Sequence, residues 1–392
     1  MESPAATRPR YPSWVLLDTN AYFDEGVSST TAHALTRAGD AVRVTFCIAS
    51  PPFVSHFCIP VNPNYYCSAP TGAQVISSAK DLVLLRFTFP LSQEYFVYQA
   101  AGSNPSSLRS IPSIHPGASN HCILPCESDD GEFLVADLSN ALKPGHFLLD
   151  VFSSQTNKWV TRPLQLQAVR EGMPRQPYKV VALGGAAVGW IDLWRGILVC
   201  DEVLDDHPVL RFVPLPRPGF GFDQRKGTEV LVNGNAKSTS FKTTYDLDAE
   251  DTIHDSELLP QKMESVPAEK YTLVPDGWKI RTCYRHISWD YWRKGHVVEA
   301  DDIMVCNQEH CKVLPQLWDY NAGRSALRSL AVSYPTLSTR GDDVVYFVSK
   351  VKINDRGAWV VGVDLRKKTV ERGSSGEYCR LFPTSIPLMF VL

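Results

Sequence analysis

Hydrophobic and polar residues alternate over short stretches of this chain and do not follow a helical period. In Val42–Ala49 (VRVTFCIA) every second residue is apolar, which is typical of a strand with one buried face. A second apolar stretch, Phe53–Pro60, comes after Ser50-Pro51-Pro52, where two prolines mark a turn because they cannot lie inside a central strand. No run of about ten residues keeps a helical period, whereas about twenty short stretches qualify as strands. The pattern predicts an all-β protein.

The stretch VVALGGAAVGWIDLWRGILVCD shows how such strands follow one another. Val180–Leu183 and Ile197–Cys200 are apolar runs typical of buried strands, and a third strand lies between them around Trp190. Gly184-Gly185 and Arg195-Gly196 supply the backbone freedom for tight turns. Three short strands joined by tight turns predict a meander, the unit from which all-β repeat folds are built.

Apolar strands that end in an aspartate recur along the chain. They occur at Asp18, Asp137, Asp150, Asp201 and Asp364, at irregular intervals. Blade repeats of roughly 40–50 residues would give six to eight blades in a chain of this length. We therefore expect a β-propeller-like array of short antiparallel meanders. Two packed β-sandwich domains are the alternative, because an acidic stretch in the middle of the chain could also be a linker.

The composition of local stretches suggests the domain organisation. Residues 1–10, rich in Pro, Ala and Arg, are expected to be a disordered tail, and residues 11–392 a single propeller-like domain. Residues 22–40 are rich in small and turn residues and are predicted to be a loop. Residues 224–270 are polar and acidic, and we expect a surface insertion there, partly disordered.

The charge and cysteine content narrow the class of protein. The 392 residues are 44% hydrophobic, which is enough apolar material to form a core. The formal net charge is −3, so the chain lacks the excess of basic residues that nucleic-acid binding requires. No stretch approaches the roughly 20 apolar residues of a membrane span, and the N-terminus has no signal-peptide core. Ten cysteines are far below the density of a disulfide scaffold. We expect a cytoplasmic or nuclear protein with neither nucleic acid nor membrane as partner.

Several stretches resemble a plant family that is expanded in grasses and known only as domain of unknown function 1618. They are YPSWVLLD (11–18), SPPFVS (50–55), DLVLLRF (81–87), GWIDLWRGILVCD (189–201), RFVPLP (211–216), PDGWKI (275–280), SWDYW (288–292), LSTRGDDVVYFVSK (337–350) and WVVGVDLR (359–366). More remotely, the apolar-Asp hairpins are similar to F-box-associated and kelch-type propellers. No F-box precedes them here, so an adaptor role in ubiquitin ligation does not carry over. The resemblance implies a plant origin, a β-rich fold and no activity that could be transferred.

Motifs for cofactors and metals are incomplete. Gly184–Gly189 lacks the helix that a dinucleotide loop opens and the Gly-Lys-Ser/Thr of a P-loop, so we interpret it as a hairpin turn. His121, Cys122 and Cys126 could be half of a zinc site, with Cys306, His310 and Cys311 as the other half. The two groups lie far apart in sequence and neither has the C-x-x-C form. We expect no metal site and no cofactor.

Carboxylates could in principle carry hydrolysis. Asp192 and Asp201 flank one predicted hairpin and Glu202 follows, and glycosidases use paired carboxylates as acid and nucleophile. Aspartates at strand ends, however, usually cap or solvate turns. No complete catalytic motif is present, so we assign no catalytic residue.

Tryptophan, tyrosine and arginine gather beside predicted turns in the second half of the chain. Core packing between blades is the ordinary role of a tryptophan. Beside turns, however, these residue types anchor protein–protein interfaces. The candidate partner-binding residues are Trp194, Arg195, Trp289, Tyr291, Trp292 and Arg293.

These observations favour a non-enzymatic scaffold that binds another protein or a peptide through its loop face. The alternative is a propeller-type hydrolase with carboxylates at a central channel. A third interpretation is that the acidic stretch Asp246–Glu257 docks a basic partner. The sequence does not identify the partner.

Overall fold

The fold is built almost entirely of β-strands, and we describe it from a computed structural model. The structure describes residues 11–51, 53–61, 70–101, 105–112, 121–126, 131–166, 179–192, 195–215, 230–233, 237–246, 274–286, 289, 291–305, 318–319, 324–325, 327–338, 342–351, 358–371, 380–381 and 390–391. In this part of the chain the only helices are short 3-10 turns, such as Ala300–Asp302 and Leu327–Ser329. No helix among these residues is long and apolar enough to cross a membrane.

Most strands are grouped in six units of four, which we call blades 1 to 6. Blade 1 is β1 (Leu16–Phe23), β2 (Ala32–Leu35), β3 (Ala41–Cys47) and β4 (Val54–Ile59), and blade 2 is β5 (Gly72–Ala79), β6 (Leu82–Thr88), β7 (Gln93–Gln99) and β8 (Ser107–Ile111). Blade 3 is β9 (Cys122–Pro125), β10 (Phe133–Asn140), β11 (His146–Ser153) and β12 (Lys158–Gln165), and blade 4 is β13 (Lys179–Gly184), β14 (Ala187–Asp192), β15 (Gly196–Cys200) and β16 (Leu210–Pro214). Blade 5 is β17 (Val230–Asn233), β18 (Lys237–Asp246), β19 (Val274–Tyr284) and β20 (Arg293–Glu299), and blade 6 is β23 (Ala331–Leu337), β24 (Val344–Lys350), β25 (Ala358–Asp364) and β26 (Thr369–Val370). The remaining strands are short: β21 (Trp318–Asp319), β22 (Arg324–Ser325), β27 (Arg380–Leu381) and β28 (Phe390–Val391).

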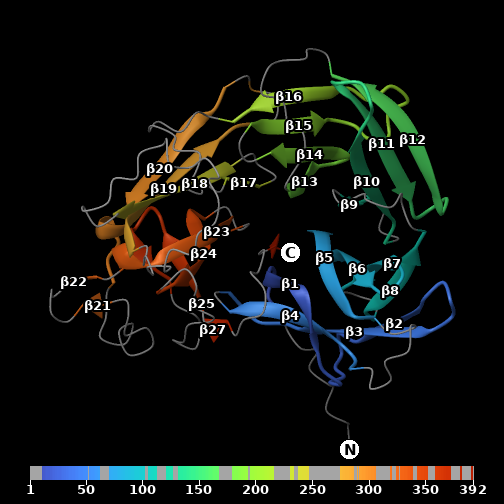
Figure 1. The fold of residues 1–392 in the computed structure, drawn as a ribbon, viewed down its shortest axis with the longest axis horizontal. Coiled ribbons are helices and arrows are strands. Elements are labelled where there is room, and N and C mark those ends of the chain that lie inside the picture. The colour runs from blue at the N-terminus through green and yellow to red at the C-terminus, as the bar shows by residue number, and fades with distance from the viewer. Residues whose placement is uncertain are drawn as a thin grey trace, which may run out of the picture.

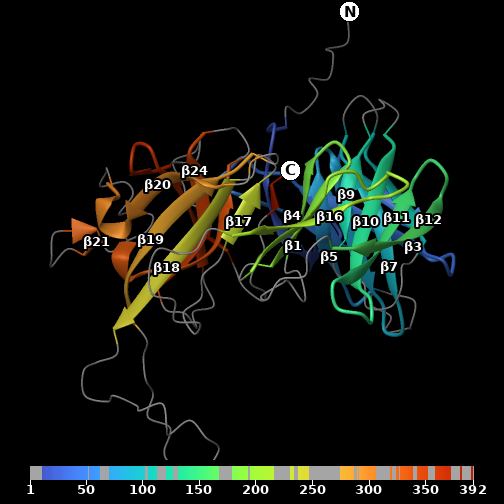
Figure 2. The same ribbon diagram turned by 90° about the horizontal axis from the view of Figure 1, so that it is seen from above.

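The blades are arranged around a central region, as Figure 1 shows, with β9 and β13 on the inner side and β12 and β16 on the outer side. Strands that are consecutive in sequence pair antiparallel within blades 2 to 6, which is the meander expected from the sequence. Blades 1 and 2 touch through one backbone pair, Asn20 with Gln74. Seen from above in Figure 2, β17–β20 lie on one side of the molecule and β9–β12 on the other. The predicted all-β, propeller-like fold is confirmed.

Six hydrophobic clusters lie between consecutive blades and explain the ring. They join blade 1 to 2 (for example Leu17 and Leu85), 2 to 3 (Leu84 and Val135), 3 to 4 (Leu149 and Trp190), 4 to 5 (Ile191 and Trp292), 5 to 6 (Trp278 and Phe347) and 6 to 1 (Val348 and Leu16). A strand such as β6 therefore buries both faces, Leu84 on one side and Leu85 on the other. That explains why LVLLRF is a continuous apolar run. The alternative of two β-sandwiches, in which the outer faces are solvated, does not describe this arrangement.

Blade 1 departs from the simple meander. β1 pairs with β4 in parallel, with a register shift between Leu17 and Ala21, and its first residues pair antiparallel with β28. The first strand therefore extends to Phe23, and β2 forms at Ala32. The prediction of a loop over residues 22–40 is wrong at these two strands. Local composition favoured a turn, but pairing with β4 and β3 extends the backbone.

Blade 5 begins inside the stretch 224–270. β17 and β18 pair with each other, and β18 pairs with β19 along its whole length, so these strands belong to a blade. Residues 247–273 lie outside the described part of the chain, as do residues 1–10. The surface insertion and the disordered tail stay predictions.

The aspartates that were predicted to end strands do so only in part. Asp364 ends β25 and Asp201 directly follows β15, but Asp18, Asp137 and Asp150 lie inside their strands. A carboxylate can be buried inside a strand where protein groups replace its hydrogen bonds to water. Inside these strands protein groups take the place of water: Tyr22 Oη donates to Asp18 at 2.7 Å, and Thr161 Oγ1 donates to Asp150.

Candidate functional site

The turn between β19 and β20 gathers aromatic side chains beside a cation. Tyr284 and Arg293 are paired across the two strands, so the turn starts and ends at the same place. Within it the Trp289 amide donates to the His286 carbonyl at 3.0 Å, which closes a tight loop. We call Tyr284, His286, Trp289, Tyr291 and Arg293 the aromatic turn.

The rings of the aromatic turn are stacked. Trp289 and Tyr291 lie almost parallel, with an interplanar angle of 4° and centroids 5.4 Å apart. The Arg293 guanidinium carbon lies 4.5 Å from the Trp289 ring centroid, within the range of a cation–π contact. Tyr284, the last residue of β19, and His286, in the turn, contact Trp289 with ring centroids 6.4 Å and 6.0 Å away. Five side chains thus form one ordered group.

This group is also accessible. Tyr291 is 52% exposed, Arg293 is exposed and Trp289 is half-buried. Hydrogen bonds to the hydroxyls of Tyr291 and Tyr284 raise the pKa of Arg293 above its ordinary value, so the cation stays charged at every physiological pH. A flat aromatic surface with a fixed positive charge can hold an extended peptide by stacking, by carboxylate pairing or by both.

Trp292 has a different environment from its neighbours. Its Nε1 donates to the Pro214 carbonyl at 2.9 Å, and its ring packs against the apolar cluster of blade 4 that contains Ile191 and Val213. Trp292 therefore joins blade 5 to blade 4. This is the ordinary packing role of a tryptophan, and it separates Trp292 from the accessible ring stack.

Arg195 lies close to the same junction. Its backbone amide donates to the Asp192 carbonyl at 3.1 Å, and its guanidinium lies 3.9 Å from the carboxylate of Asp192, which is buried. Its carbonyl accepts from the Leu215 amide, the residue after Pro214. The structure thus brings Arg195 and Trp292 to one edge of blade 4. Trp194 lies outside the described residues.

The candidate carboxylate pair does not form a site. Asp192 ends β14, whereas Asp201 follows the far end of β15, because the two strands are antiparallel. Five residues of strand separate such positions by about 16 Å, well beyond the 5–10 Å between glycosidase carboxylates. Asp201 is instead held by Arg211 through two hydrogen bonds of 2.8 Å and 2.9 Å.

Another pair of aspartates was missed. Asp137 and Asp150 lie opposite each other on β10 and β11, and both are buried. His121 Nδ1 lies 3.2 Å from Asp137 Oδ1, and the His121 ring stacks on Tyr95 of blade 2 at 4.8 Å. The recurring apolar-Asp pattern was the available signal, but facing across strands requires the register.

Of the zinc ligands suggested by the sequence, the described cysteines Cys122 and Cys126 do not converge. Cys122 and Cys126 stand four residues apart along β9, which is about 13 Å, too far for two sulfurs that each bind zinc at about 2.3 Å. Cys122 is fully buried, and burial raises the pKa of its thiol to about 12. Cys306, His310 and Cys311 lie outside the described residues.

A different set of potential ligands does meet. Cys47, His56 and Cys58 place their donor atoms within 4.8 Å of one another, in the one such group among the described residues. The sequence contained a signal for it: the Ser50–Pro52 turn pairs the two strands, and alternation puts these three side chains on one face.

Comparisons with known proteins assign no activity to this chain. Residues 190–346 match the model of the family described as protein of unknown function DUF1618. No curated protein matches the chain. Among solved structures, the α-L-arabinanase of Penicillium chrysogenum complexed with arabinobiose is 8% identical, with 95% of this chain and 87% of that chain covered and a TM-score of 0.28. The tail fibre of Staphylococcus aureus phage P68 is also 8% identical, with 90% and 83% covered and a TM-score of 0.19.

Proposed function

We propose that this protein is a non-enzymatic intracellular scaffold that binds a peptide segment of another protein through the aromatic turn. The observation that supports it is the stack of Trp289, Tyr291 and Arg293, which is ordered and accessible. Tyr, Trp and Arg are the residue types that dominate binding energies at protein interfaces. Because the stack exists without a partner, little side-chain entropy is lost on binding.

The position of the aromatic turn suits this role. It lies between two paired strands whose other residues are held in blade 5, and the adjacent Trp292 fixes that blade to blade 4. A rigid base holds the stack in one orientation. Arg293 adds a preference for partners with a carboxylate or a negative patch.

The carboxylate pair Asp192 and Asp201 does not support the hydrolase alternative, since the two residues lie at opposite ends of blade 4. Docking of a basic partner by Asp246–Glu257 stays a prediction. Of these residues only Asp246, at the end of β18, lies in the described part of the chain.

The test is an affinity capture from native tissue followed by a binding measurement with the captured partner. Wild type is compared with a Tyr291→Ala, Arg293→Ala double variant, in which Trp292 is kept because it packs between blades. We expect a discrete partner whose affinity falls at least about tenfold in the variant.

The matched control is a Phe23→Ala, Arg366→Ala double variant, because Phe23 is 52% exposed like Tyr291 and Arg366 is exposed. It removes an aromatic ring and a cation from a different part of the surface and should bind like wild type. Equal binding by both double variants, or no discrete partner, would reject the proposal.

A further inference from the structure

The hairpin of β3 and β4 carries two thiols and an imidazole on one face. Cys47 is paired with His56 across the two antiparallel strands, and Cys58 follows His56 by two residues on the same strand. Residues at these positions point to the same side of a sheet. The opposite face carries Phe46 and Phe57, which are in the hydrophobic cluster between blades 1 and 2. The three polar side chains are therefore held in place by a buried apolar face.

The spacing of the donor atoms fits a bound metal ion. The two sulfurs and a ring nitrogen lie within 4.8 Å of one another. Tetrahedral zinc with sulfur ligands at about 2.3 Å and nitrogen at about 2.0 Å needs its ligand atoms roughly 3.5–4 Å apart. A small change of side-chain torsion angle closes the difference.

A disulfide is the competing use of two close thiols, and the register argues against it. Cys47 faces His56 and Cys58 faces Thr45, so the two cysteines are diagonal neighbours. Diagonal positions in an antiparallel pair are about 7–8 Å apart, beyond the usual Cα separation across a disulfide of about 4.4–6.8 Å. The same diagonal lets both sulfurs reach one ion placed between them.

The surroundings of the three ligands are acidic and orient the imidazole. The His56 ring makes an edge contact with Tyr22 at 5.1 Å, and Tyr22 Oη donates to Asp18 Oδ2 at 2.7 Å. Carboxylates around a site favour the binding of a cation and support its first ligands.

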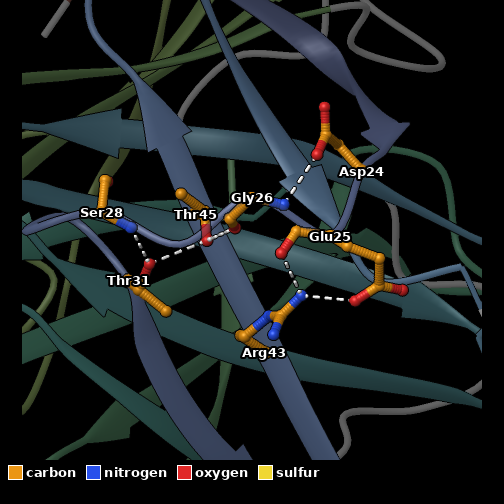
Figure 3. Close-up of polar contacts among 7 residues, drawn as sticks. All are labelled: Asp24, Glu25, Gly26, Ser28, Thr31, Arg43 and Thr45. Atoms are coloured by element: carbon orange, nitrogen blue, oxygen red, sulfur yellow. Dashed lines mark hydrogen bonds and ion pairs between the residues drawn. The ribbon is translucent and has the colours of Figure 1, made fainter.

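Asp24 is held beside the ligands by a network of hydrogen bonds, shown in Figure 3. Its amide donates to the carbonyl of Ile59, next to Cys58, at 3.0 Å, and its Oδ1 accepts from the Gly26 amide at 2.7 Å. The segment that follows is held against β3. Arg43 Nη2 donates to the backbone carbonyl of Glu25 at 3.1 Å and to its carboxylate Oε2 at 2.8 Å, and Thr45 Oγ1 donates to the Gly26 carbonyl at 3.1 Å. Thr45 lies two residues before Cys47, so one network fixes a ligand strand and the adjacent carboxylate.

We propose that Cys47, His56 and Cys58 bind a zinc-class divalent cation on the face of β3 and β4 opposite Phe46 and Phe57. Two thiolates and one imidazole are a donor set that selects soft and borderline metals over calcium or magnesium. Three protein ligands leave a fourth position, which faces solvent because Cys47 is exposed, and water or a ligand from another molecule takes it. The site lies on β3 and β4, whereas the aromatic turn joins β19 and β20, so the two proposals are independent.

The experiment uses the full chain, purified with reductant and stripped with a chelator. Zn²⁺ is titrated by calorimetry, and Co²⁺ is used as a spectroscopic probe because thiolate-to-cobalt charge-transfer bands report sulfur ligation directly. We expect the wild type to bind one equivalent of metal that Cys47→Ser and His56→Gln bind at least about tenfold more weakly, with loss of the cobalt–thiolate band.

Cys47 is exposed and His56 is half-buried, so both variants should fold, and an unchanged circular dichroism spectrum verifies it. Cys126→Ser, which alters a half-buried thiol outside the group, is the matched control and should bind like wild type. The proposal is overturned if wild type and Cys47→Ser bind equally, or if wild type shows no cobalt–thiolate band. It is also overturned if mass spectrometry without reductant shows a disulfide bond between Cys47 and Cys58, which lowers the mass by two hydrogens.

Discussion

Single residues decide how closely the strands of a blade can approach. Gly196 opens β15 and is paired with Asp192 on one side and Pro214 on the other. A Cβ atom at this position would lie 2.5 Å from the Val213 carbonyl oxygen and 2.7 Å from a ring carbon of Phe212. The need for glycine here comes from close packing, whereas Gly184 and Gly185 are needed for their positive φ angles of 106° and 56°.

Gly196→Ala is therefore expected to destabilise blade 4. Overpacking against a backbone atom costs about 1–3 kcal/mol, because the neighbouring strand must move. The free energy of unfolding in urea measures it. Gly72→Ala is the control, since no atom lies within 4 Å of a Cβ at that position and its effect should be small. Equal stability of both variants would contradict the packing argument.

The buried thiol of Cys122 makes stability depend on alkaline pH. Burial raises its pKa to about 12 in the folded state, whereas an unfolded thiol ionises near its ordinary value. Below that ordinary value both states keep the proton and the contribution is constant. Above it only the unfolded chain releases the proton, so stability is lost as the pH rises toward 12.

Wild type should thus lose about 1.5–2 kcal/mol more stability than Cys122→Ala between pH 8 and pH 10, since each pH unit above the ordinary thiol pKa of about 8.5 corresponds to about 1.4 kcal/mol. Urea unfolding at both pH values measures the difference. The variant is its own control for other titrating groups, which both proteins share. If the stability of the two proteins fell equally over this pH range, the pKa of the Cys122 thiol would not be raised by burial.

At the scale of elements, polar residues inside strands hold neighbouring blades in register. His121 precedes β9, faces Asp137 of β10 and stacks on Tyr95 of β7, so it connects blades 2 and 3. Asp150 lies opposite Asp137. Both buried carboxylates have polar neighbours: Thr161 Oγ1 donates to Asp150, and His121 Nδ1 lies 3.2 Å from Asp137 Oδ1.

His121→Ala is expected to lower the free energy of unfolding by about 2–3 kcal/mol, because the ring between Tyr95 and Asp137 is lost while both carboxylates stay buried. A His121→Leu, Asp137→Leu double variant should recover most of this loss, since apolar replacement of a whole buried pair is often neutral. Chemical unfolding of the wild type and of the two variants measures both changes. Failure of the double variant to recover would show that the pair does not act as a unit.

Elements were predicted well where their signals are local. The turn at Ser50–Pro52 and the strands beside it agree with β3 and β4, and Gly184-Gly185 turns β13 into β14. Prediction failed where pairing overrides composition. The second half of β1 contains Asn20 and Tyr22 and gives no apolar pattern, yet β4 holds it extended through a register shift.

At the scale of the whole molecule, the first strand pairs with the last strand of the described residues. β28 pairs with β1, where Leu16 faces Val391 and Leu17 faces Phe390. Together with the apolar cluster between blades 6 and 1, this pairing closes the ring. A closed ring leaves no exposed inner edge at this point.

Deletion of residues 390–392 is expected to lower the melting temperature by several degrees, because β1 loses backbone hydrogen bonds at the closure. Differential scanning calorimetry measures the shift. Deletion of residues 1–10, expected from composition to be a disordered tail, is the comparison and should leave the melting temperature unchanged. Similar shifts for the two deletions would argue against closure by β28.

The candidate sites show where prediction from the sequence ends. Tryptophan, tyrosine and arginine beside a turn were recognisable as a cluster, but Trp292 packs between blades while Trp289 and Tyr291 stack outside them. The cysteines and histidine of β3 and β4 were visible one by one. Their convergence depends on which residue of β3 faces which residue of β4.

By itself the sequence determined that the chain is all-β and that short meanders build it, because a period of two and turn residues act over a few neighbours. The tertiary structure alone decided the number of blades, the parallel pairing in blade 1 and the closure by β28. It also decided which polar residues are buried together and which are exposed. These features depend on contacts between residues far apart in the chain, which local patterning does not encode.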